Sequence, residues 1–318
     1  MTKQVFSKTI QDNNGLRVPD FFVVGAPKCG TTAINKFLSQ HPDIFISARK
    51  ELHYFGGDLD WRNYSMSKEE YFSYFCEVDS KQIAGETSVF YLFSKDAADE
   101  IKTWNPNSRI IAIIRDPMEM IPSLHRQFLK TGNEFILDLE EALDAEPERK
   151  KGNKLPRKEN MGLNQGLFYS EMARYSEQLE RYFQVFGRDR VHVILYEDFK
   201  KNPASVYRGI LEFLGVDPTF QPEFSYINTK VQIKSPWLWK FVKFPPEYLR
   251  QIWRTIIPSK LRGQILVKVS QLYSKKAPRK TLPEPTRLRL HEMYRDDVKQ
   301  LEEILGRDLS SWLGGIKK

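Results

Sequence analysis

The sequence predicts an α/β fold with a doubly wound parallel sheet, helices on both faces of the sheet and a basic, helical extension at the C-terminus. Five short apolar runs lack the polar alternation of half-exposed strands, which is typical of strands buried on both faces of a parallel sheet. Segments with one apolar helical face lie between runs, as expected where crossover helices join parallel strands. A glycine loop directly follows the first run, where doubly wound folds bind phosphate groups.

The predicted strands are rich in β-branched and aromatic residues, and turn residues follow most of them. They are Phe21–Val24, Ile44–Ile46, Ile83–Ala84, Ile110–Ile114 and Val191–Leu195. Because the carboxyl ends of parallel strands meet at one edge of a sheet, we expect the loops that follow these runs to share a crevice.

Apolar residues at helical spacing predict the main helices. These helices are Thr32–Gln40, Glu171–Phe186 and Arg287–Trp312, and the charged segment Asp138–Asn160 is predicted as a helix followed by a mobile loop. The last helix is amphipathic, and its inward-facing side chains are predicted to be Leu290, Met293, Tyr294, Val298, Leu301 and Leu305.

The length and composition bound the domain organisation. The chain has 318 residues, of which 41% are hydrophobic, so it can bury the core of one large or two modest domains. We expect one domain over residues 1–318. Its parts are a polar tail at 1–18, an α/β core at 20–225, a basic aromatic segment at 228–280 and a C-terminal helix at 281–318.

Cysteine content and the N-terminus predict the compartment. Cys29 and Cys76 are the two cysteines, too few for a disulfide framework, and lone cysteines fit a reducing compartment. The first 20 residues are polar and lack the apolar stretch of a signal peptide, and no uncharged apolar window reaches membrane-spanning length. We therefore expect a soluble, cytoplasmic chain without a Golgi-type anchor and without stable membrane insertion.

The basic charge lies in one segment. Of a net charge of +8, the segment Lys230–Lys280 carries +12, from 13 Lys or Arg against Glu247, and the rest of the chain carries −4. Such a patch attracts nucleic acid, acidic lipid or phosphorylated cofactors alike, so the charge alone does not choose among them.

The sharpest motif is GAPKCGTT at residues 25–32, directly after the first predicted strand and directly before a helix. A strand, a glycine loop and a helix N-terminus aim backbone N–H groups and a positive dipole end at one point, which suits a phosphate. An ordinary P-loop is disfavoured, because Lys28 lies inside the loop and Gly30 is followed by Thr31 rather than by lysine. The simpler alternative is a plain strand-to-helix turn.

A second motif, Arg115-Asp116-Pro117, ends the fourth predicted strand. Aspartate as N-cap and proline as first helical residue start a helix, and they place the Arg115 guanidinium over the same sheet edge as the glycine loop. Two anion sites would then flank one crevice; the alternative is a surface arginine beside an ordinary helix start. Pro122 predicts an interruption of that helix just before Ser123.

Together the two motifs resemble those of sulfotransferases that use 3′-phosphoadenosine 5′-phosphosulfate (PAPS), both bacterial-type enzymes and the related glycosaminoglycan sulfotransferase domains. Residues 25–32 resemble the family's 5′-phosphosulfate loop, and Arg115 with Ser123 falls on its 3′-phosphate motif. Further resemblances extend over nearly the whole chain; they are KELHYF at 50–55, GETS at 85–88, the Tyr-Glu-Asp strand at 193–199, FLG at 213–215 and GRDL at 306–309.

The resemblance implies PAPS as donor, adenosine 3′,5′-bisphosphate (PAP) as product, and no metal. It places Lys28 at the leaving oxygen and Arg115 with Ser123 at the 3′-phosphate. The other loop residues expected at the 5′-phosphate are Pro27, Cys29, Gly30, Thr31 and Thr32. The basic segment is expected to fold over the donor, with Lys276 and Arg279 among its candidate phosphate contacts.

Two residues of the KELHYF stretch are candidates for the general base that takes the acceptor's proton. Glu51 falls on the family's catalytic glutamate, and His53 is the rival because an imidazole titrates near neutral pH. Lys50 is a further candidate for binding donor or acceptor anions. The five histidines are scattered without a metal-ligand spacing.

The expected reaction is sulfuryl transfer to a hydroxyl or amine of a small metabolite or natural product. A carbohydrate acceptor is the first alternative. A nucleotide kinase-like phosphoryl transferase shares the topology, but the chain lacks a lysine after Gly30 and a clear Walker-B carboxylate. A nucleic-acid or acidic-membrane binding module, built on the basic segment, is the alternative outside enzymes; no nucleic-acid partner is expected.

Overall fold

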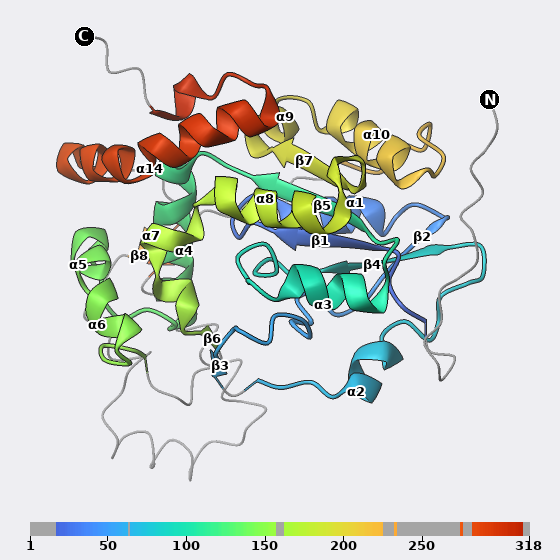
Figure 1. The fold of residues 1–318 in the computed structure, drawn as a ribbon, viewed down its shortest axis with the longest axis horizontal. Helices are drawn as coiled ribbons and strands as arrows, with labels where there is room; N and C mark the ends of the chain where they lie inside the picture. The colour runs from blue at the N-terminus through green and yellow to red at the C-terminus, as the bar shows by residue number, and fades with distance from the viewer. Residues whose placement is uncertain are drawn as a thin grey trace.

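A parallel sheet of five strands forms the centre of the structure, in the order β2-β4-β1-β5-β7 (Figure 1). The computed structural model describes residues 17–62, 64–156, 162–224, 232–233, 274–275 and 282–313. The five strands are β1 (Phe21–Gly25), β2 (Ile44–Ile46), β4 (Ile83–Thr87), β5 (Arg109–Ile114) and β7 (Val191–Leu195). All five predicted strands are therefore confirmed, with β4 extended by three residues.

The strand order reverses at β1, which lies between β4 and β5. The chain runs from β1 to the edge strand β2, returns to β4 beside β1, and then crosses to β5 and β7 on the other side. In open α/β sheets a ligand crevice forms at such a reversal, outside the carboxyl ends of the two strands. The glycine loop follows β1 and Arg115 follows β5, so the topology brings the two predicted anion sites to one point.

Helices cover both faces of the sheet. One face carries α8, which contacts β5 and β7, together with α3 and α14, which contact α8 (Figure 1). On the other face α1 and α10 meet through the rings of Phe37 and Tyr207, whose centroids are 6.5 Å apart. The longer helices are α1 (Thr31–Leu38), α3 (Ala97–Trp104), α4 (Pro117–Thr131), α8 (Tyr175–Phe186), α10 (Pro203–Leu214) and α14 (Glu284–Leu305).

Shorter elements complete the described chain. The helices are α2 (Lys68–Ser73), α5 (Leu139–Asp144), α6 (Glu146–Lys150), α7 (Tyr169–Met172) and α9 (Tyr196–Lys201), with 3₁₀ turns at Gln165–Leu167, Arg188–Arg190 and Ser310–Leu313. Two antiparallel pairs join β3 (Trp61–Arg62) to β6 (Gly162–Leu163) and β8 (Gln232–Ile233) to β9 (Ser274–Lys275). No helix in the described ranges is long and apolar enough to cross a membrane.

The prediction that Pro122 interrupts its helix is wrong. Helix α4 continues through Pro122 to Thr131. The proline removes one backbone hydrogen bond, but the neighbouring side chains of Met120, Ile121 and Leu124 are almost completely buried against the core. Burial of this apolar face outweighs the lost bond, so Ser123 lies on a regular second turn.

Two predicted helices are shorter than expected. Glu171–Phe186 is divided between α7 and α8, because the Asp297 carboxylate of α14 accepts the backbone N–H groups of Tyr175 (3.0 Å) and Ser176 (3.2 Å) and so caps the start of α8. The last helix ends at Leu305, where Gly306 takes the left-handed conformation that terminates helices. Its predicted inward face is confirmed: Leu290, Tyr294, Val298 and Leu301 are buried, and Met293 and Leu305 are partly buried against the core.

The charged segment after Asp138 also differs from its prediction. It forms two helices, α5 and α6, and Asp138 caps the first by accepting the N–H groups of Glu140 and Glu141. Pro147, within the first two positions of α6, starts a new helix there. The part of the predicted loop at 157–161 lies outside the described residues, as does most of the basic segment at 228–280.

Candidate active site

The glycine loop leaves β1 and enters α1 at the reversal point of the sheet. Its two glycines are required by the backbone path. At Gly25, with φ 151°, a Cβ atom would lie 2.6 Å from the carbonyl oxygen of Val89. At Gly30, the N-cap of α1 with φ 91°, it would lie 3.1 Å from the Tyr196 ring. Because neighbouring atoms leave little room for a Cβ at either glycine, the backbone N–H groups of the loop are not covered by side chains at these two positions.

Lys28 lies inside this loop and reaches the neighbouring helix. Its ammonium donates a hydrogen bond to Oε1 of Gln127 on α4. Burial, together with the positive charge of Arg115, lowers the pKa of Lys28 from its usual value. A cation carried by this loop, next to the N-terminus of α1, is suited to negative charge that develops there.

Arg115 is held over the same loop. It is 8% exposed, and its guanidinium donates to the Lys28 carbonyl oxygen at 3.1 Å and to Oε2 of Glu119 at 2.5 Å. Its Cζ lies 4.5 Å from the centre of the Tyr196 ring. The Nε atom is buried, and no described residue pairs with it. Asp116 caps α4 through the N–H of Met118 and Pro117 is the first helical residue, as predicted.

The KELHYF segment is tied to the end of β4, next to β1. The backbone N–H of Glu51 donates to the Thr87 carbonyl oxygen at 2.8 Å, and that of His53 donates to Oγ of Ser88 at 3.1 Å. These bonds bring the Glu51 carboxylate to the crevice that holds the glycine loop. The carboxylate receives Nζ of Lys50 at 2.8 Å and has Nε2 of His53 at 3.7 Å.

Three of the candidate site residues have a strained backbone. Four described residues other than glycine have a left-handed φ, and three of them are Lys28 (63°), Glu51 (62°) and His53 (48°). Side chains with a Cβ atom pay roughly 1–2 kcal/mol for this conformation. Such residues cluster at functional sites because the surrounding structure holds the side chain where the chemistry needs it. This signal is not visible in the sequence.

His53 is enclosed by aromatic rings. Its imidazole stacks on Trp61 with ring centres 4.0 Å apart, and Tyr64, Phe90 and Tyr91 surround it. The side chain is 8% exposed, and burial lowers the pKa of His53, which favours the neutral ring. A neutral imidazole in this place is better suited to orienting Glu51 than to taking a proton from a substrate.

Glu51 is the more accessible of the two candidate bases, with 41% of its side chain exposed. Burial of the carboxylate raises its pKa, but the nearby His53 imidazole and the charge of Lys50 outweigh this and hold the pKa of Glu51 at about 2. The carboxylate is therefore ionised at neutral pH and able to accept a proton, although the contact with Lys50 keeps it weakly basic.

Glu86, which the sequence did not single out as a site residue, helps to hold the KELHYF segment in place through Ser88. Its fully buried carboxylate accepts hydrogen bonds from Ser88 Oγ at 2.5 Å and from the Tyr71 hydroxyl at 2.7 Å. The same Ser88 oxygen accepts the His53 N–H. The GETS stretch contains both residues, but only the fold reveals that Glu86 points into the core.

Burial raises the pKa of Glu86 to about 7, against the opposing hydrogen bonds from Ser88 and Tyr71. The pKa of Glu86 is higher in the folded chain than the usual value of 4.5, which applies when the chain is unfolded. The contribution of this carboxyl to folding stability is therefore fully present below pH 4.5 and is lost as the pH rises through about 7. We expect this carboxyl to contribute a fall of about 3 kcal/mol in the free energy of unfolding over this range. Burial also raises the pKa of Asp116 to about 7, so urea titrations at several pH values should show the dependence reduced in Glu86→Gln and unchanged in Glu180→Gln, an exposed control. An unchanged dependence in Glu86→Gln would contradict the assignment.

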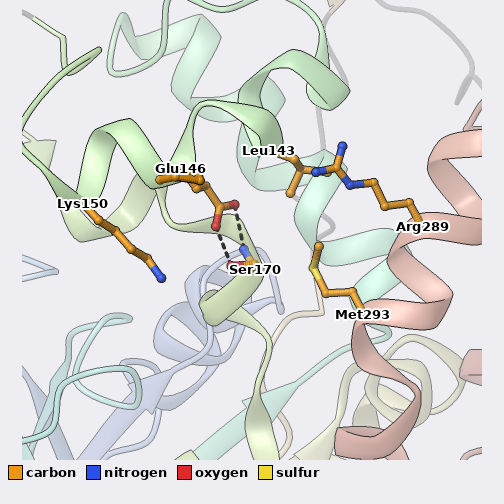
Figure 2. A pocket seen from close by; sticks show the side chains of 7 residues that line it. Leu143, Glu146, Lys150, Ser170, Arg289 and Met293 are labelled. Atoms are coloured by element: carbon orange, nitrogen blue, oxygen red, sulfur yellow. Dashed lines mark hydrogen bonds between the residues drawn. The ribbon is translucent and has the colours of Figure 1, made fainter.

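A cavity of about 380 Å³ lies elsewhere, between α6, α7 and α14 (Figure 2). Glu146 in its wall accepts hydrogen bonds from both the N–H and the hydroxyl of Ser170. Lys150 pairs with Glu171, and Arg289 pairs with Glu140 and Asp144. Each of its charged groups thus already has a hydrogen-bond or ion-pair partner, and none of the predicted site residues lines it.

The remaining predicted site residues differ in which of their atoms could reach a ligand. Thr31 is 4% exposed and Thr32 is exposed, both at the start of α1, and Ser123 is half-buried on α4. The Cys29 thiol is fully buried and bonds to the Pro27 carbonyl, so only the backbone of Cys29 can reach a ligand. Lys276 and Arg279 lie outside the described residues. Within the described ranges, His, Cys, Asp and Glu form no group of three that could hold a metal ion.

Comparisons with known proteins bear on the family of this chain. Residues 18–281 match the sulfotransferase domain family. The chain is 24% identical over 285 residues to a membrane-associated sulfotransferase, kil1, of Dictyostelium discoideum (67% of this chain, 59% of that protein). It is 22% identical over 219 residues to heparan sulfate glucosamine 3-O-sulfotransferase 3A1 of Mus musculus (68% and 51%). It thus spans between half and three fifths of the length of these two relatives.

The same fold occurs in a solved structure. A sulfotransferase from Alicyclobacillus acidocaldarius superposes with a TM-score of 0.68 at 27% sequence identity, covering 93% of this chain and 99% of the other. The similarity therefore extends across the sheet, the crevice and the surrounding helices.

Proposed function

The chain belongs to the sulfotransferase domain family, and we propose that it transfers the sulfuryl group of PAPS to a hydroxyl or amine of a small metabolite or natural product. The observation that carries the proposal is the convergence of three sequence-distant segments on one crevice. The glycine loop after β1 and Arg115 after β5 supply two anion sites, and Glu51 lies beside them.

The residues of the crevice fit a molecule with a phosphate at each end. Arg115 has a buried Nε atom without a partner among the described residues, which a 3′-phosphate oxygen would satisfy. Ser123, on the helix α4 that follows Arg115, is proposed as a second contact to that phosphate. At the other end the N-terminus of α1, with the backbone of residues 27–30 and the hydroxyls of Thr31 and Thr32, would hold the 5′-phosphate. Lys276 and Arg279, in the basic segment, are proposed as further phosphate contacts on the basis of charge.

The chain's own contribution to the reaction is electrostatic and general-base catalysis. PAPS supplies a sulfuryl group whose bond to the 5′-phosphate breaks as the acceptor attacks. The Lys28 ammonium and the loop N–H groups would stabilise negative charge on the leaving oxygen. The Glu51 carboxylate would take the acceptor's proton, with His53 holding it in place.

A carbohydrate acceptor is the second candidate, since several relatives are named as carbohydrate or heparan sulfate sulfotransferases. Both candidates are tested by incubating the chain with PAPS and a panel of hydroxyl, amine and saccharide acceptors. Mass spectrometry should detect the gain of one sulfuryl group in one acceptor class. Transfer of phosphate from ATP, with none from PAPS, would instead support a kinase-like activity.

The free, unpaired state of Cys29 and Cys76 supports a cytoplasmic location.

The bipartite donor site predicts a selective effect of Arg115. Replacing Arg115 by alanine is expected to weaken PAP binding by about 2–3 kcal/mol, because a buried charged hydrogen bond to the 3′-phosphate is lost. Adenosine 5′-monophosphate, which lacks that phosphate, should bind almost as before. Isothermal titration of both ligands measures this, with Arg208→Ala as control, since Arg208 pairs with Glu212 on the exposed face of α10. Equal losses for the two ligands would remove Arg115 from the 3′-phosphate site.

A further inference from the structure

Lys50 joins the glycine loop to the candidate base. Its ammonium lies 3.3 Å from Oγ1 of Thr31, the first residue of α1, and 2.8 Å from Oε1 of Glu51. Thr31 is 4% exposed and the Lys50 side chain 20%, so this contact lies at the inner end of the crevice. One cation thus touches both the site proposed for the donor's 5′ end and the carboxylate proposed to activate the acceptor.

This arrangement opposes the work of Glu51 as a base. One carboxylate oxygen receives Lys50 and the other faces His53 Nε2 at 3.7 Å. A carboxylate neutralised on one side by an ammonium is a poor proton acceptor. For efficient proton transfer, at least one of the two contacts has to loosen when the substrates are bound.

Lys50 is the contact that can loosen. His53 is fixed by the stacking of its imidazole on Trp61 and by the hydrogen bond from its backbone N–H to Oγ of Ser88. Lys50 has a flexible four-carbon stem, and its second contact is a neutral hydroxyl at the point where a new anion would arrive. The other charged groups near Glu51 do not compete for that role: Lys28 bonds to Gln127 on α4, and Arg49 lies near Tyr74 and Glu70.

We propose that Lys50 is a catalytic residue that exchanges Glu51 for the sulfonate oxygens of the donor. This assignment rests on the proposed function. With the donor seated on the N-terminus of α1, the ammonium turns from the carboxylate to the sulfonate. It thereby stabilises the sulfuryl group in transfer and frees Glu51 to accept a proton. As the acceptor oxygen or nitrogen forms its bond to sulfur, its proton passes to Glu51, and the electron pair of the broken S–O bond stays on the 5′-phosphate of PAP.

The exchange predicts that Lys50 distinguishes PAPS from PAP, because only PAPS carries the sulfonate. In Lys50→Met, the dissociation constant for PAPS should rise about tenfold, since the sulfonate then meets the Glu51 carboxylate without a cation between them. The dissociation constant for PAP should change less than about threefold. Turnover should fall by about 10–10²-fold, and Lys50→Arg, which keeps the charge, should recover part of both losses. Isothermal titration with PAP and with PAPS in the absence of acceptor gives the binding readout.

Lys95→Met, an exposed lysine on another segment, is the matched control and should behave as the unaltered chain. Equal changes for PAP and PAPS in Lys50→Met, or no change for either, would overturn the assignment while leaving the proposed function intact. Failure of the unaltered chain to bind either nucleotide would overturn the proposed function and the assignment with it. The two failures are therefore distinguishable in one set of titrations.

Discussion

Turnover of Glu51→Gln is expected to fall by about 10²–10⁴, the range that general-base catalysis supplies. Glutamine keeps the size of the side chain and can still accept a hydrogen bond from Lys50, but it cannot take the acceptor's proton. The strained backbone at residue 51, with φ 62°, is the same in both, so the amide should occupy the same place. Donor affinity should be nearly unchanged. Steady-state rates with saturating PAPS and titrations with PAP measure the two quantities separately.

His53→Ala is the companion variant and should cost less. Its imidazole is 8% exposed beneath Trp61, and its contact with Glu51 orients the carboxylate without reaching a substrate. Loss of that orientation lowers turnover but leaves the base itself in place. An inactive His53→Ala together with near-normal Glu51→Gln would make the histidine the base and reverse this order.

Turnover of Lys28→Ala is expected to fall by about 10²–10³, which is the scale of removing one preorganised electrostatic donor. A lysine proposed to stabilise charge that develops on the leaving oxygen should act more on the transition state than on the ground state. Donor affinity should change only modestly because the N–H groups at the start of α1 remain. Lys28→Arg should also be poor, since a planar guanidinium does not replace a compact ammonium.

The matched control for Lys28 is Lys81→Ala, an exposed lysine on another segment. Its turnover should equal that of the unaltered chain. Activity of the unaltered chain should survive excess EDTA, because the proposed transfer needs no metal bridge to the leaving group. Near-normal turnover in Lys28→Ala, or an absolute requirement for Mg²⁺, would instead favour the kinase-like alternative.

The sheet and its glycine loop were predictable from local sequence. Runs such as Ile110–Ile114 are apolar throughout because both faces of the strand are covered, and all five side chains are almost fully buried. The loop was predictable because strand, glycines and helix are contiguous. The prediction that this loop and Arg115 lie at one crevice followed from the rule that ligands bind where the strand order reverses.

The errors come from contacts between distant segments. The break before Tyr175 depends on Asp297, which is more than 120 residues away. The continuity of α4 through Pro122 depends on burial of its neighbours against the rest of the core. Helical spacing contains neither fact, since it reports which residues share a face and not what that face meets.

The site shows the same limit at finer scale. KELHYF identified Glu51 and His53, but the left-handed backbone at both positions and the support from Ser88 and Glu86 arise only when β4 is in place. Glu86 reads as an ordinary strand-end carboxylate until its burial beside the Tyr71 hydroxyl is known. Sequence patterns therefore identified chemistry-bearing residues better than the groups that position them.

If one crevice holds both phosphates of PAP, isothermal titration of PAP into the unaltered chain without divalent metal should show one PAP bound per chain. Its affinity should be at least about tenfold higher than that of adenosine 5′-monophosphate, which lacks the phosphate proposed to bind Arg115. Absence of PAP binding, or equal affinity for the two nucleotides, would contradict it.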